Sequence, residues 1–487
     1  MISELKAGDD FKGDVKIMRK VKPGPTILVI TDIAGSIDAV TKDTPFDVGD
    51  IVYLEGKVSE RQGKLQIEIQ SIRKSDHDFT HMLEELAKPE DRPLSIDSER
   101  LSKLRPKFMK AAQLIRKAVL QHQPILIRHH ADADGIMSGL AIEKACALLM
   151  EQIGINPTHN LYRSPSKAPF YEVADVFKDI AFTKKVLENH NQEKPLVLVL
   201  DNGSTPEDVF AHKTLKSMGF DVIVIDHHNP VELENGKTAV CPYLLYHINP
   251  YIDGMDSKTS AGMLCYEVAR LVHASFDLPL MPAIAGISDR CDIPETEAYI
   301  KNTGKSHVEL QDMGTAIDYI AYNLRFDSGV GVYEEVFKND AMVKMILEKV
   351  KEGEETQLQS TLPYLRTQEI NGVLLSFIDL EKYTLRFTYP TPGKVLGRIH
   401  DRISKDKGIP VLTIGLLSDM AIIRATEPVL PVAEIIESIQ KAMPEANADG
   451  GGHEVAGTLK FVQAHQAAIV EHIKRLLRER DTSPKEE

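Results

Sequence analysis

Four short apolar runs, each closed by acidic or imidazole side chains, constrain the fold of this chain more than any other feature. The four segments read ILIRHHADADG from Ile125, LVLVLDNGS from Leu196, VIVIDHH from Val222 and AIAGISDR from Ala283. β-branched runs that alternate with amphipathic helical patterns are typical of a parallel sheet wound with crossover helices. The carboxyl ends of such strands converge on one crevice, so the closing polar residues are expected to meet there. The sequence therefore predicts an α/β core with a functional site at one edge of its sheet.

The side chains expected at this edge are carboxylates and imidazoles, with no thiolate among them. They are His130, Asp132, Asp134, Asp201, Asp226, His227, His228 and Asp289. Oxygen and nitrogen donors of this kind favour Mn²⁺ or Mg²⁺ over a structural zinc ion. So many acids in one crevice would repel one another unless cations lay among them, and their number favours two ions. Two ions about 4 Å apart activate water and stabilise the charge of an attacked phosphate, which predicts phosphoester hydrolysis.

The same residues have plainer interpretations when they are taken one at a time. An Asp that follows a strand is often only the N-cap of the next helix, and this applies to Asp201 and Asp289. A pair of adjacent histidines carries less information still. The segment HHADADG is more informative, because His130, Asp132 and Asp134 stand at alternate positions, on one side of an extended segment. Three such groups would cost stability unless something bound them.

The composition limits the expected partners and compartment. With 58 Lys and Arg against 72 Asp and Glu, the formal charge is −14, which excludes a uniformly basic surface that coats nucleic acid. Any contact with nucleic acid is therefore expected to be local. The four cysteines form no CxxC pair, which argues against a zinc ribbon or a disulfide framework. No stretch approaches about 18 apolar residues and the N-terminus lacks an apolar signal region, so we expect a cytoplasmic protein without a membrane partner.

The pattern of apolar, polar and turn-forming residues changes along the chain, which predicts four segments. Residues 1–76 alternate apolar and polar positions between turn signals and are expected to form an OB-like β-barrel. Residues 77–122 read as a helical linker, and residues 123–360 as the main α/β domain with a helical insertion. Residues 361–487 read as a smaller α/β domain, with strands expected at 372–378, 383–388, 411–416 and 420–425.

The predicted barrel carries a cluster of basic residues near its start. They are Lys12, Lys16, Arg19, Lys20 and Lys22. Such a cluster would give the barrel a basic edge suited to a single strand of nucleic acid. The alternative is a solvated edge on a structural barrel, since OB-folds also serve as protein adaptors.

Two motifs follow each other along the chain: first the triplet Asp226-His227-His228, and then the glycine-rich segment DGGGHEVAGT from Asp449 to Thr458. Together they resemble the DHH phosphoesterase superfamily with its C-terminal DHH-associated domain, and within it the RecJ-type exonucleases. The resemblance covers roughly residues 120–460. The barrel, HHADADG and the helical insertion after Asp289 are similar to archaeal RecJ-like nucleases, members of which associate with the GINS replication complex.

The resemblance implies roles for the residues at the sheet edge. One cation would be held by His130, Asp132 and Asp201, and the other by Asp134, Asp201, His227 and Asp289, so that Asp201 bridges the pair. His228 would face the substrate phosphate, and Asp226 would orient the histidines. Several branches of the superfamily have a His where Arg128 stands, and RecJ-like members often have Asp where His130 stands. His130 is therefore either a ligand or a near neighbour of the site.

The resemblance also implies a substrate-binding segment in residues 361–487. Gly450, Gly451 and Gly452 would let a backbone turn approach a phosphate closely, and His453 would donate to its oxygens. Arg424 matches the arginine with which the family clamps a substrate phosphate. The alternative for Arg424 is a solvated position on a strand.

Three functions are compatible with these motifs. The favoured one is a metal-dependent exonuclease on single-stranded DNA or RNA, with two divalent cations and Mn²⁺ preferred over Mg²⁺, acting in DNA replication or repair with GINS as a partner. A second keeps the chemistry but takes short oligonucleotides or cyclic dinucleotides, although an added barrel contributes nothing to so small a substrate. The third is a replisome scaffold without activity, but every position expected to bind metal still carries a competent ligand.

Overall fold

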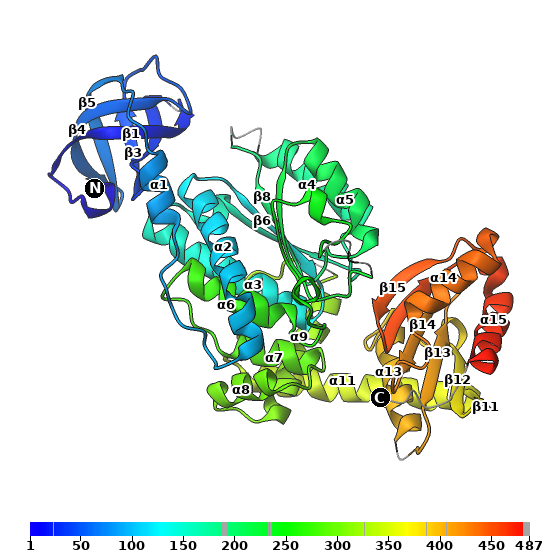
Figure 1. Cartoon of the computed structure of the whole chain (residues 1–487). Helices are drawn as coiled ribbons and strands as arrows, with labels where there is room; N and C mark the ends of the chain where they lie inside the picture. The colour runs from blue at the N-terminus through cyan, green and yellow to red at the C-terminus, as the bar shows by residue number, and fades with distance from the viewer. Residues whose placement is uncertain are drawn as a thin grey trace. The chain divides into compact units, whose positions relative to one another are not determined.

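The computed structural model describes residues 1–480 except 23, 188–191, 232, 234, 235, 326, 386 and 406, and the side chains of 452 and 453 (Figure 1). The chain divides into two compact units. Unit 1 comprises Met1–Gly314 and Leu324–Val330, and unit 2 comprises Thr315–Asn323 and Gly331–Glu487. Among the described residues, no helix combines the length and the apolar character needed to cross a bilayer.

The N-terminal strands of unit 1 form a closed barrel, as the alternating pattern predicts. They are β1 (Asp10–Val21), β2 (Thr26–Thr31), β3 (Ser36–Thr41), β4 (Ile51–Arg61) and β5 (Lys64–Lys74), in the order β1-β2-β3-β5-β4. Every second residue points inward, so Val15, Ile17, Leu28 and Ile30 form part of a dry core. The parallel pairing of β3 with β5 closes the cylinder.

The basic cluster of the barrel is largely neutralised by neighbouring acids. Lys12 pairs with Glu55 at 3.1 Å, Lys20 with Asp47 at 2.7 Å and Lys22 with Asp43 at 2.8 Å. Three of the five expected phosphate contacts are thus engaged within the barrel. This surface offers a single strand less free positive charge than the sequence alone indicates.

A parallel sheet follows two helices, α1 (Thr80–Ala87) and α2 (Glu99–Leu120), which lie in the segment expected to be a helical linker. Its strands are β6 (Ile125–His130), β7 (Leu161–Ser166), β8 (Leu196–Leu200), β9 (Asp221–Ile225) and β10 (Tyr246–Ile248), in the order β10-β9-β8-β6-β7. Because β6 leads outward to β7 and the chain then returns to β8, the strand order reverses between β6 and β8. Ligands of open α/β sheets bind beyond the carboxyl ends at such a point.

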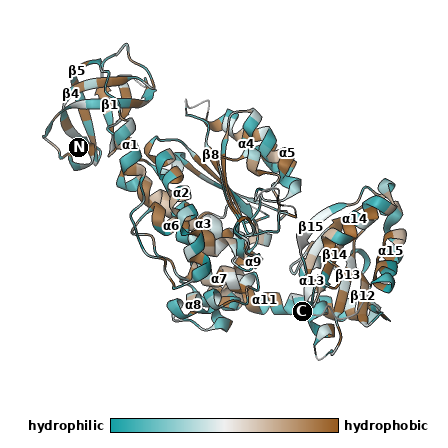
Figure 2. Cartoon of the chain, viewed as in Figure 1, coloured by the Kyte–Doolittle hydropathy of each residue, from teal (hydrophilic) through white to brown (hydrophobic). Residues whose placement is uncertain are grey.

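Helices cover both faces of this sheet (Figure 1). The covering helices are α3 (Ala133–Gln152), α4 (Val173–Phe182), α5 (Val209–Ser217) and α6 (Ala261–Val272). Helices α4 and α5 pack on the face that carries Val197 and Val199, whereas α2, α3 and α6 lie on the other face. The strands around β8 are strongly hydrophobic (Figure 2), as expected for a sheet buried on both sides.

The fourth apolar run is a helix, which corrects the expectation of a strand. Residues 283–288 lie in α7 (Leu280–Ser288), so Asp289 follows a helix. Periodicity cannot separate a short buried strand from a buried helix, which explains the error. The helical insertion continues with α8 (Pro294–Thr303), α9 (His307–Asn323), α10 (Val332–Glu335) and α11 (Asp340–Thr361).

Unit 2 contains a mixed sheet of six strands. They are β11 (Arg366–Ile370), β12 (Val373–Asp379), β13 (Val411–Leu416), β14 (Met420–Ala425), β15 (Asp449–His453) and β16 (Ala456–Lys460), in the order β11-β12-β13-β14-β16-β15. The helices of unit 2 that follow α11 are α12 (Leu380–Tyr383), α13 (Pro392–Ser404), α14 (Val432–Ala442) and α15 (Gln466–Glu479). The strand expected at 383–388 is wrong, because α12 ends there and the described residues beyond it form no strand.

The barrel contacts the main sheet through Ser36, the first residue of β3. Oγ of Ser36 lies 2.8 Å from Nε2 of His122, just before β6, and a Cβ on Gly154, which precedes β7, would lie 2.6 Å from the carbonyl oxygen of Ser36. Both contacts are made at turns that precede strands. The barrel therefore contacts the amino-terminal edge of the sheet, opposite to the edge that carries the acids and histidines.

This contact should make the barrel's attachment sensitive to pH. Burial and the nearby Lys16 lower the pKa of His122 to about 4. A histidine whose pKa is lowered in the fold contributes stability above its ordinary pKa, about 6.5, and that contribution is lost as pH falls toward 4. We expect a loss of roughly 3 kcal/mol over this window. Asparagine tolerates the positive φ of 59° at this position, so His122→Asn should show a weaker pH dependence.

The measurement is amide hydrogen exchange of residues 33–36 in both proteins at pH 4.5 and 7, corrected for intrinsic rates. The wild type should lose protection at the lower pH by more than the variant does. Equal losses in the two proteins would contradict the role assigned to His122.

Candidate metal centre

The first three predicted ligands come from the end of β6 and the start of α3. His130 is the last residue of β6, Asp132 is the N-cap of α3, and Asp134 lies in its first turn. Oδ1 of Asp132 accepts a hydrogen bond from the backbone N–H of Gly135 at 3.0 Å. The expected extended segment with alternating side chains is therefore wrong beyond Asp132. The helical turn, rather than strand alternation, brings Asp134 into the site.

Asp201 follows β8 in a left-handed backbone conformation, with φ of 56°. Such a conformation is costly for a residue with a side chain and is usually retained where function requires it. Its backbone N–H donates to the carbonyl oxygen of Ile225 at the end of β9, 2.9 Å away. The side chain of Asp201 is almost completely buried. The acid is therefore placed at the reversal between β6 and β8.

The structure brings the predicted ligands into overlapping groups, each able to hold one ion. The groups are His130, Asp132 and Asp201; Asp134, His227 and Asp289; and Asp201, His227 and His228, with ligand atoms in each group within 4.8 Å of one another. Asp201 and His227 each belong to two of the groups. A bridge between two cations through Asp201 stays a prediction.

Individual distances are those of residues that share a small site. Nδ1 of His130 lies 2.9 Å from Asp132 and 3.6 Å from Asp201. Nε2 of His227 lies 3.3 Å from Asp201, 3.2 Å from Asp289 and 3.7 Å from Asp134. His130 is thus close enough to be a ligand, and its assignment stays a prediction.

The electrostatics of the site fit a cation. Burial, followed by repulsion from Asp201 and Asp289, raises the pKa of Asp134 well above its ordinary value. Burial also raises the pKa of Asp289 to about 6, against the opposing effect of His227 and with a further contribution from Asp201. These carboxylates resist ionisation because they face one another in a buried place. A divalent cation among them would remove that cost.

Asp226 is placed to orient the adjacent histidines. Its Oδ1 accepts hydrogen bonds from Nδ1 of His228 at 2.8 Å and from the backbone N–H groups of His227 and His228 at 2.8 and 3.1 Å. Burial alone would raise the pKa of Asp226, but the interactions with His228 and His227 outweigh burial and lower it. Asp226 therefore stays ionised and holds the ring of His228.

Several backbone groups that shape the site were not identified individually from the sequence. The carbonyl oxygen of Ser257 accepts a hydrogen bond from Nδ1 of His227 at 2.6 Å, which leaves Nε2 facing the carboxylates. The backbone N–H groups of Ala261 and Gly262 donate to Asp134 at 3.0 and 2.7 Å. Of these three residues, Gly262 is the one whose type is restricted by the contact, because a Cβ there would lie 2.7 Å from Oδ1 of Asp134.

The residues expected to bind substrate belong to unit 2. Arg424 lies on β14, half-buried, and its Nη1 donates to the carbonyl oxygen of Ile423 at 3.2 Å. Gly451 and Gly452 are strand residues of β15 paired with β16, so the expected phosphate-binding turn is wrong for these positions. The side chain of His453 lies outside the described part of the chain.

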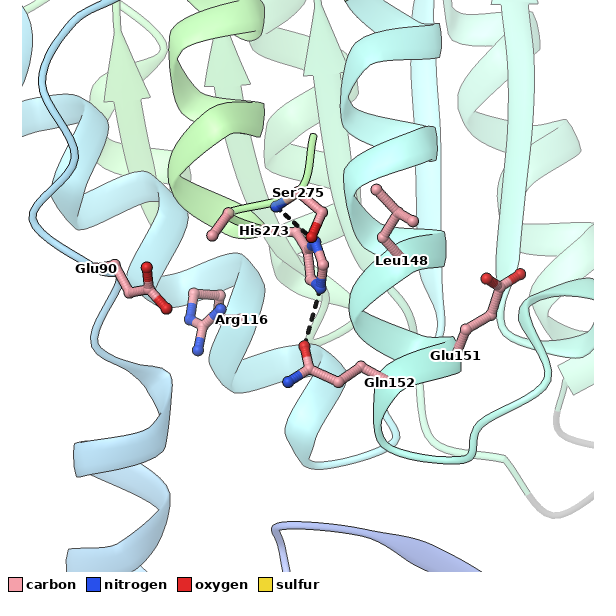
Figure 3. Close-up of a pocket in the computed structure, with 8 residues that line it drawn as sticks. Glu90, Arg116, Leu148, Glu151, Gln152, His273 and Ser275 are labelled. Carbon is pink, nitrogen blue, oxygen red and sulfur yellow. Dashed lines mark hydrogen bonds between the residues drawn. The ribbon is translucent and has the colours of Figure 1, made fainter. Parts of the chain in front are cut away.

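A separate polar pocket of about 500 Å³ lies away from this centre (Figure 3). Its lining includes Glu151 and Gln152 at the end of α3, and His273 just after α6. Since α3 begins at the acids and ends at the pocket, about 30 Å of helix separates the two. His273 is already bonded to Gln152 at 2.9 Å, so the pocket has no direct role at the metal centre.

Comparison with known proteins agrees with this geometry. The profile of the DHH family, N-terminal domain, matches residues 124–288, which contain every predicted acid and histidine of the metal centre except Asp289. An uncharacterised protein of Methanocaldococcus jannaschii is 35% identical over 517 residues, covering 96% of this chain and 68% of that protein.

Solved structures give the same result. The DHH domain of a protein described as a member of a family of ribosomal proteins is 35% identical, with a TM-score of 0.78 over 82% of this chain and 96% of that one. RecJ of Thermus thermophilus, solved with Mn²⁺, is 18% identical, with a TM-score of 0.51 over 81% of this chain and 57% of that one, which shows a shared fold. The chain therefore belongs to the DHH family and has a RecJ-like fold.

Proposed function

We propose that this protein is a metal-dependent phosphodiesterase, and specifically an exonuclease that hydrolyses single-stranded DNA or RNA with two divalent cations. The observation that carries the proposal is the position of Asp201, which belongs to two of the ligand groups at the strand-order reversal. Membership of the DHH family supports a phosphoesterase. An inactive scaffold would have no need to keep buried carboxylates at mutual electrostatic cost.

In this proposal, each cation has its own set of ligands. His130, Asp132 and Asp201 hold one, and Asp134, Asp201, His227 and Asp289 hold the other. The bound cations would activate a water molecule and neutralise charge on the attacked phosphate. The imidazoles among the donors favour Mn²⁺ over Mg²⁺, which prefers oxygen ligands.

His228 and Asp226 act on the substrate phosphate as a pair. Burial lowers the pKa of His228, but Asp226 raises it by more, so the ring is favoured in its protonated form. A protonated imidazole donates hydrogen bonds to phosphate oxygens and stabilises the charge that develops there. Asp226 holds this ring in place through the bond to Nδ1.

The proposal assigns the remaining segments to substrate and partners. Residues 1–76 form the barrel, 77–122 the linker, 123–360 the catalytic domain and 361–487 the substrate-binding domain. Arg424, Gly451, Gly452 and His453 are proposed to contact the substrate. A role in DNA replication or repair and a GINS partner rest on the resemblance to archaeal RecJ-like nucleases. The neutralised cluster and the position of the barrel favour protein contacts over strand guidance for that module.

The test is digestion of 5′- and 3′-labelled single-stranded DNA and RNA, each as a 4-mer and a 30-mer (about 4 and about 30 nucleotides), with Mn²⁺ or Mg²⁺. We expect stepwise shortening of the long strands, faster with Mn²⁺ and abolished by chelation. Cleavage of the 4-mers alone would favour the short-oligonucleotide alternative. Hydrolysis of a small phosphoester without cleavage of any strand would refute the nuclease and leave only the phosphoesterase.

A further inference from the structure

The loop between β10 and α6 and the first turn of α6 fix two of the proposed ligands through backbone groups. The carbonyl oxygen of Ser257, in the loop, binds Nδ1 of His227, and the N–H groups of Ala261 and Gly262, at the start of α6, bind both oxygens of Asp134. The loop thus sets the direction of Nε2 of His227, and the start of the helix that follows it sets the Asp134 carboxylate. Any shift of residues 257–262 would move both ligands together.

Arg100 of α2 binds this loop on both sides of Ser257. Its guanidinium pairs with the carboxylate of Asp256, and its Nε donates to Oγ1 of Thr259 at 3.2 Å. Asp256 in turn accepts a hydrogen bond from the backbone N–H of Lys258 at 3.0 Å. Arg100 therefore contacts Asp256, just before Ser257, and Thr259, shortly after it. Through Asp256 it is also linked to the backbone of Lys258.

Two lysines on the same face of α2 bind the start of the loop. Nζ of Lys103 donates to the carbonyl oxygen of Asp253 at 2.7 Å, and Nζ of Lys107 pairs with its carboxylate at 2.5 Å. Arg100, Lys103 and Lys107 stand at i, i+3 and i+7, the spacing of one helix face. Three basic side chains of α2 are therefore engaged with this loop.

We propose that Arg100 is a positioning residue for the metal centre: it holds residues 256–259 so that the loop aligns His227 and Asp134 for cation binding. The inference rests on the proposed function for its relevance to catalysis. Arg100 would thus influence the positions of two ligands that it does not contact. Partners that orient metal ligands typically change metal affinity by about 10- to 100-fold when they are removed.

The experiment measures Mn²⁺ affinity by electron paramagnetic resonance in Arg100→Ala, Arg100→Lys and Arg105→Ala. Arg105 is a matched control, since it lies on the same helix, pairs with Asp91 and has the same side-chain exposure as Arg100, 26%. We expect the dissociation constant of Mn²⁺ to rise about 10-fold or more in Arg100→Ala and by less than about 2-fold in Arg105→Ala. Arg100→Lys keeps the charge opposite Asp256 and should restore part of the affinity.

Amide hydrogen exchange of residues 257–262 in the metal-free proteins gives an independent readout. Arg100→Ala should lose protection there, whereas Arg105→Ala should match the wild type. Unchanged affinity and unchanged protection in Arg100→Ala would overturn the proposal. If Arg100→Ala does not fold, Asp256→Asn breaks the same ion pair at nearly constant volume and decides the question in its place.

The two proposals fail in distinguishable ways. A wild type that binds Mn²⁺ but cleaves no phosphoester refutes the proposed function and leaves the positioning role to be decided by affinity. A wild type that binds no Mn²⁺ refutes the metal centre, and the exchange measurement then decides whether Arg100 holds the loop.

Discussion

Asp201→Asn is expected to abolish hydrolysis, with a fall in kcat of about 10⁴-fold, the size seen when a member of a cooperating catalytic set is removed. The carboxylate is shared by two ligand groups, so one substitution weakens both proposed cation sites. Asparagine keeps the volume and one oxygen, and therefore tests the charge rather than the packing. Turnover of a labelled strand at saturating Mn²⁺ measures the effect.

The same variant should lose the stabilisation by Mn²⁺ while the metal-free protein changes little in stability. Removing the charge of Asp201 relieves repulsion with Asp134 but also removes attraction to His130 and His227, and these effects oppose each other. The stabilisation that Mn²⁺ gives the wild type should be lost, because a ligand stabilises the folded state only at concentrations that approach or exceed its dissociation constant. Thermal unfolding with and without Mn²⁺ separates the two effects.

Asp208→Asn is the matched control for Asp201→Asn. Asp208 is also fully buried, but its oxygens accept hydrogen bonds from Thr205 and Tyr171, and it belongs to none of the ligand groups. This variant should keep the response to Mn²⁺. Full activity in Asp201→Asn, or an equal loss of the Mn²⁺ response in both variants, would contradict the bridging role.

The sheet and the clustering of its polar residues follow from the sequence for a simple physical reason. A strand buried on both faces must be apolar along its whole length, so runs such as Leu196–Leu200 are recognisable without further context. Residues that close such runs are brought to one edge by parallel topology. Asp201, Asp226 and His227 could therefore be placed together although helices separate them along the chain.

The errors arise where apolar or glycine content is compatible with more than one structure. Residues 283–288 are apolar because α7 is buried all round, and a buried helix and a buried strand have the same composition. Gly451 and Gly452 indicate a turn by composition, yet β15 tolerates them as an edge strand beside β16. In both cases tertiary packing decided the local structure.

The support of the metal centre could not be predicted because backbone groups provide it. The carbonyl of Ser257 and the N–H groups of Ala261 and Gly262 would be present whatever side chains those positions carried. Their role depends on where the loop lies, which the basic side chains of α2 help to set. Sequence patterns identify ligands better than the groups that orient them.

Gly135→Ala is expected to damage the centre as strongly as the loss of a ligand. A Cβ at this position would overlap the carbonyl oxygen of His130 and lie 2.9 Å from Oδ2 of Asp201. The obstacle includes the backbone of β6, which cannot move aside as a flexible side chain could. We expect a loss of about 3 kcal/mol in the free energy of unfolding, at the upper end of overpacking costs, together with loss of Mn²⁺ binding.

Gly397→Ala provides the matched control, because it makes the same change at a helical glycine in α13 whose added Cβ meets no atom within 4 Å. Alanine has the higher helix propensity, so this variant should be more stable than the wild type by about 1 kcal/mol and bind Mn²⁺ normally. Chemical denaturation and Mn²⁺ titration of both variants measure the contrast. If Gly135→Ala behaved like Gly397→Ala, α3 could not approach the end of β6 as closely as the positions of His130 and Asp201 require. The proposal that the Asp201 carboxylate lies between two cations would then be wrong.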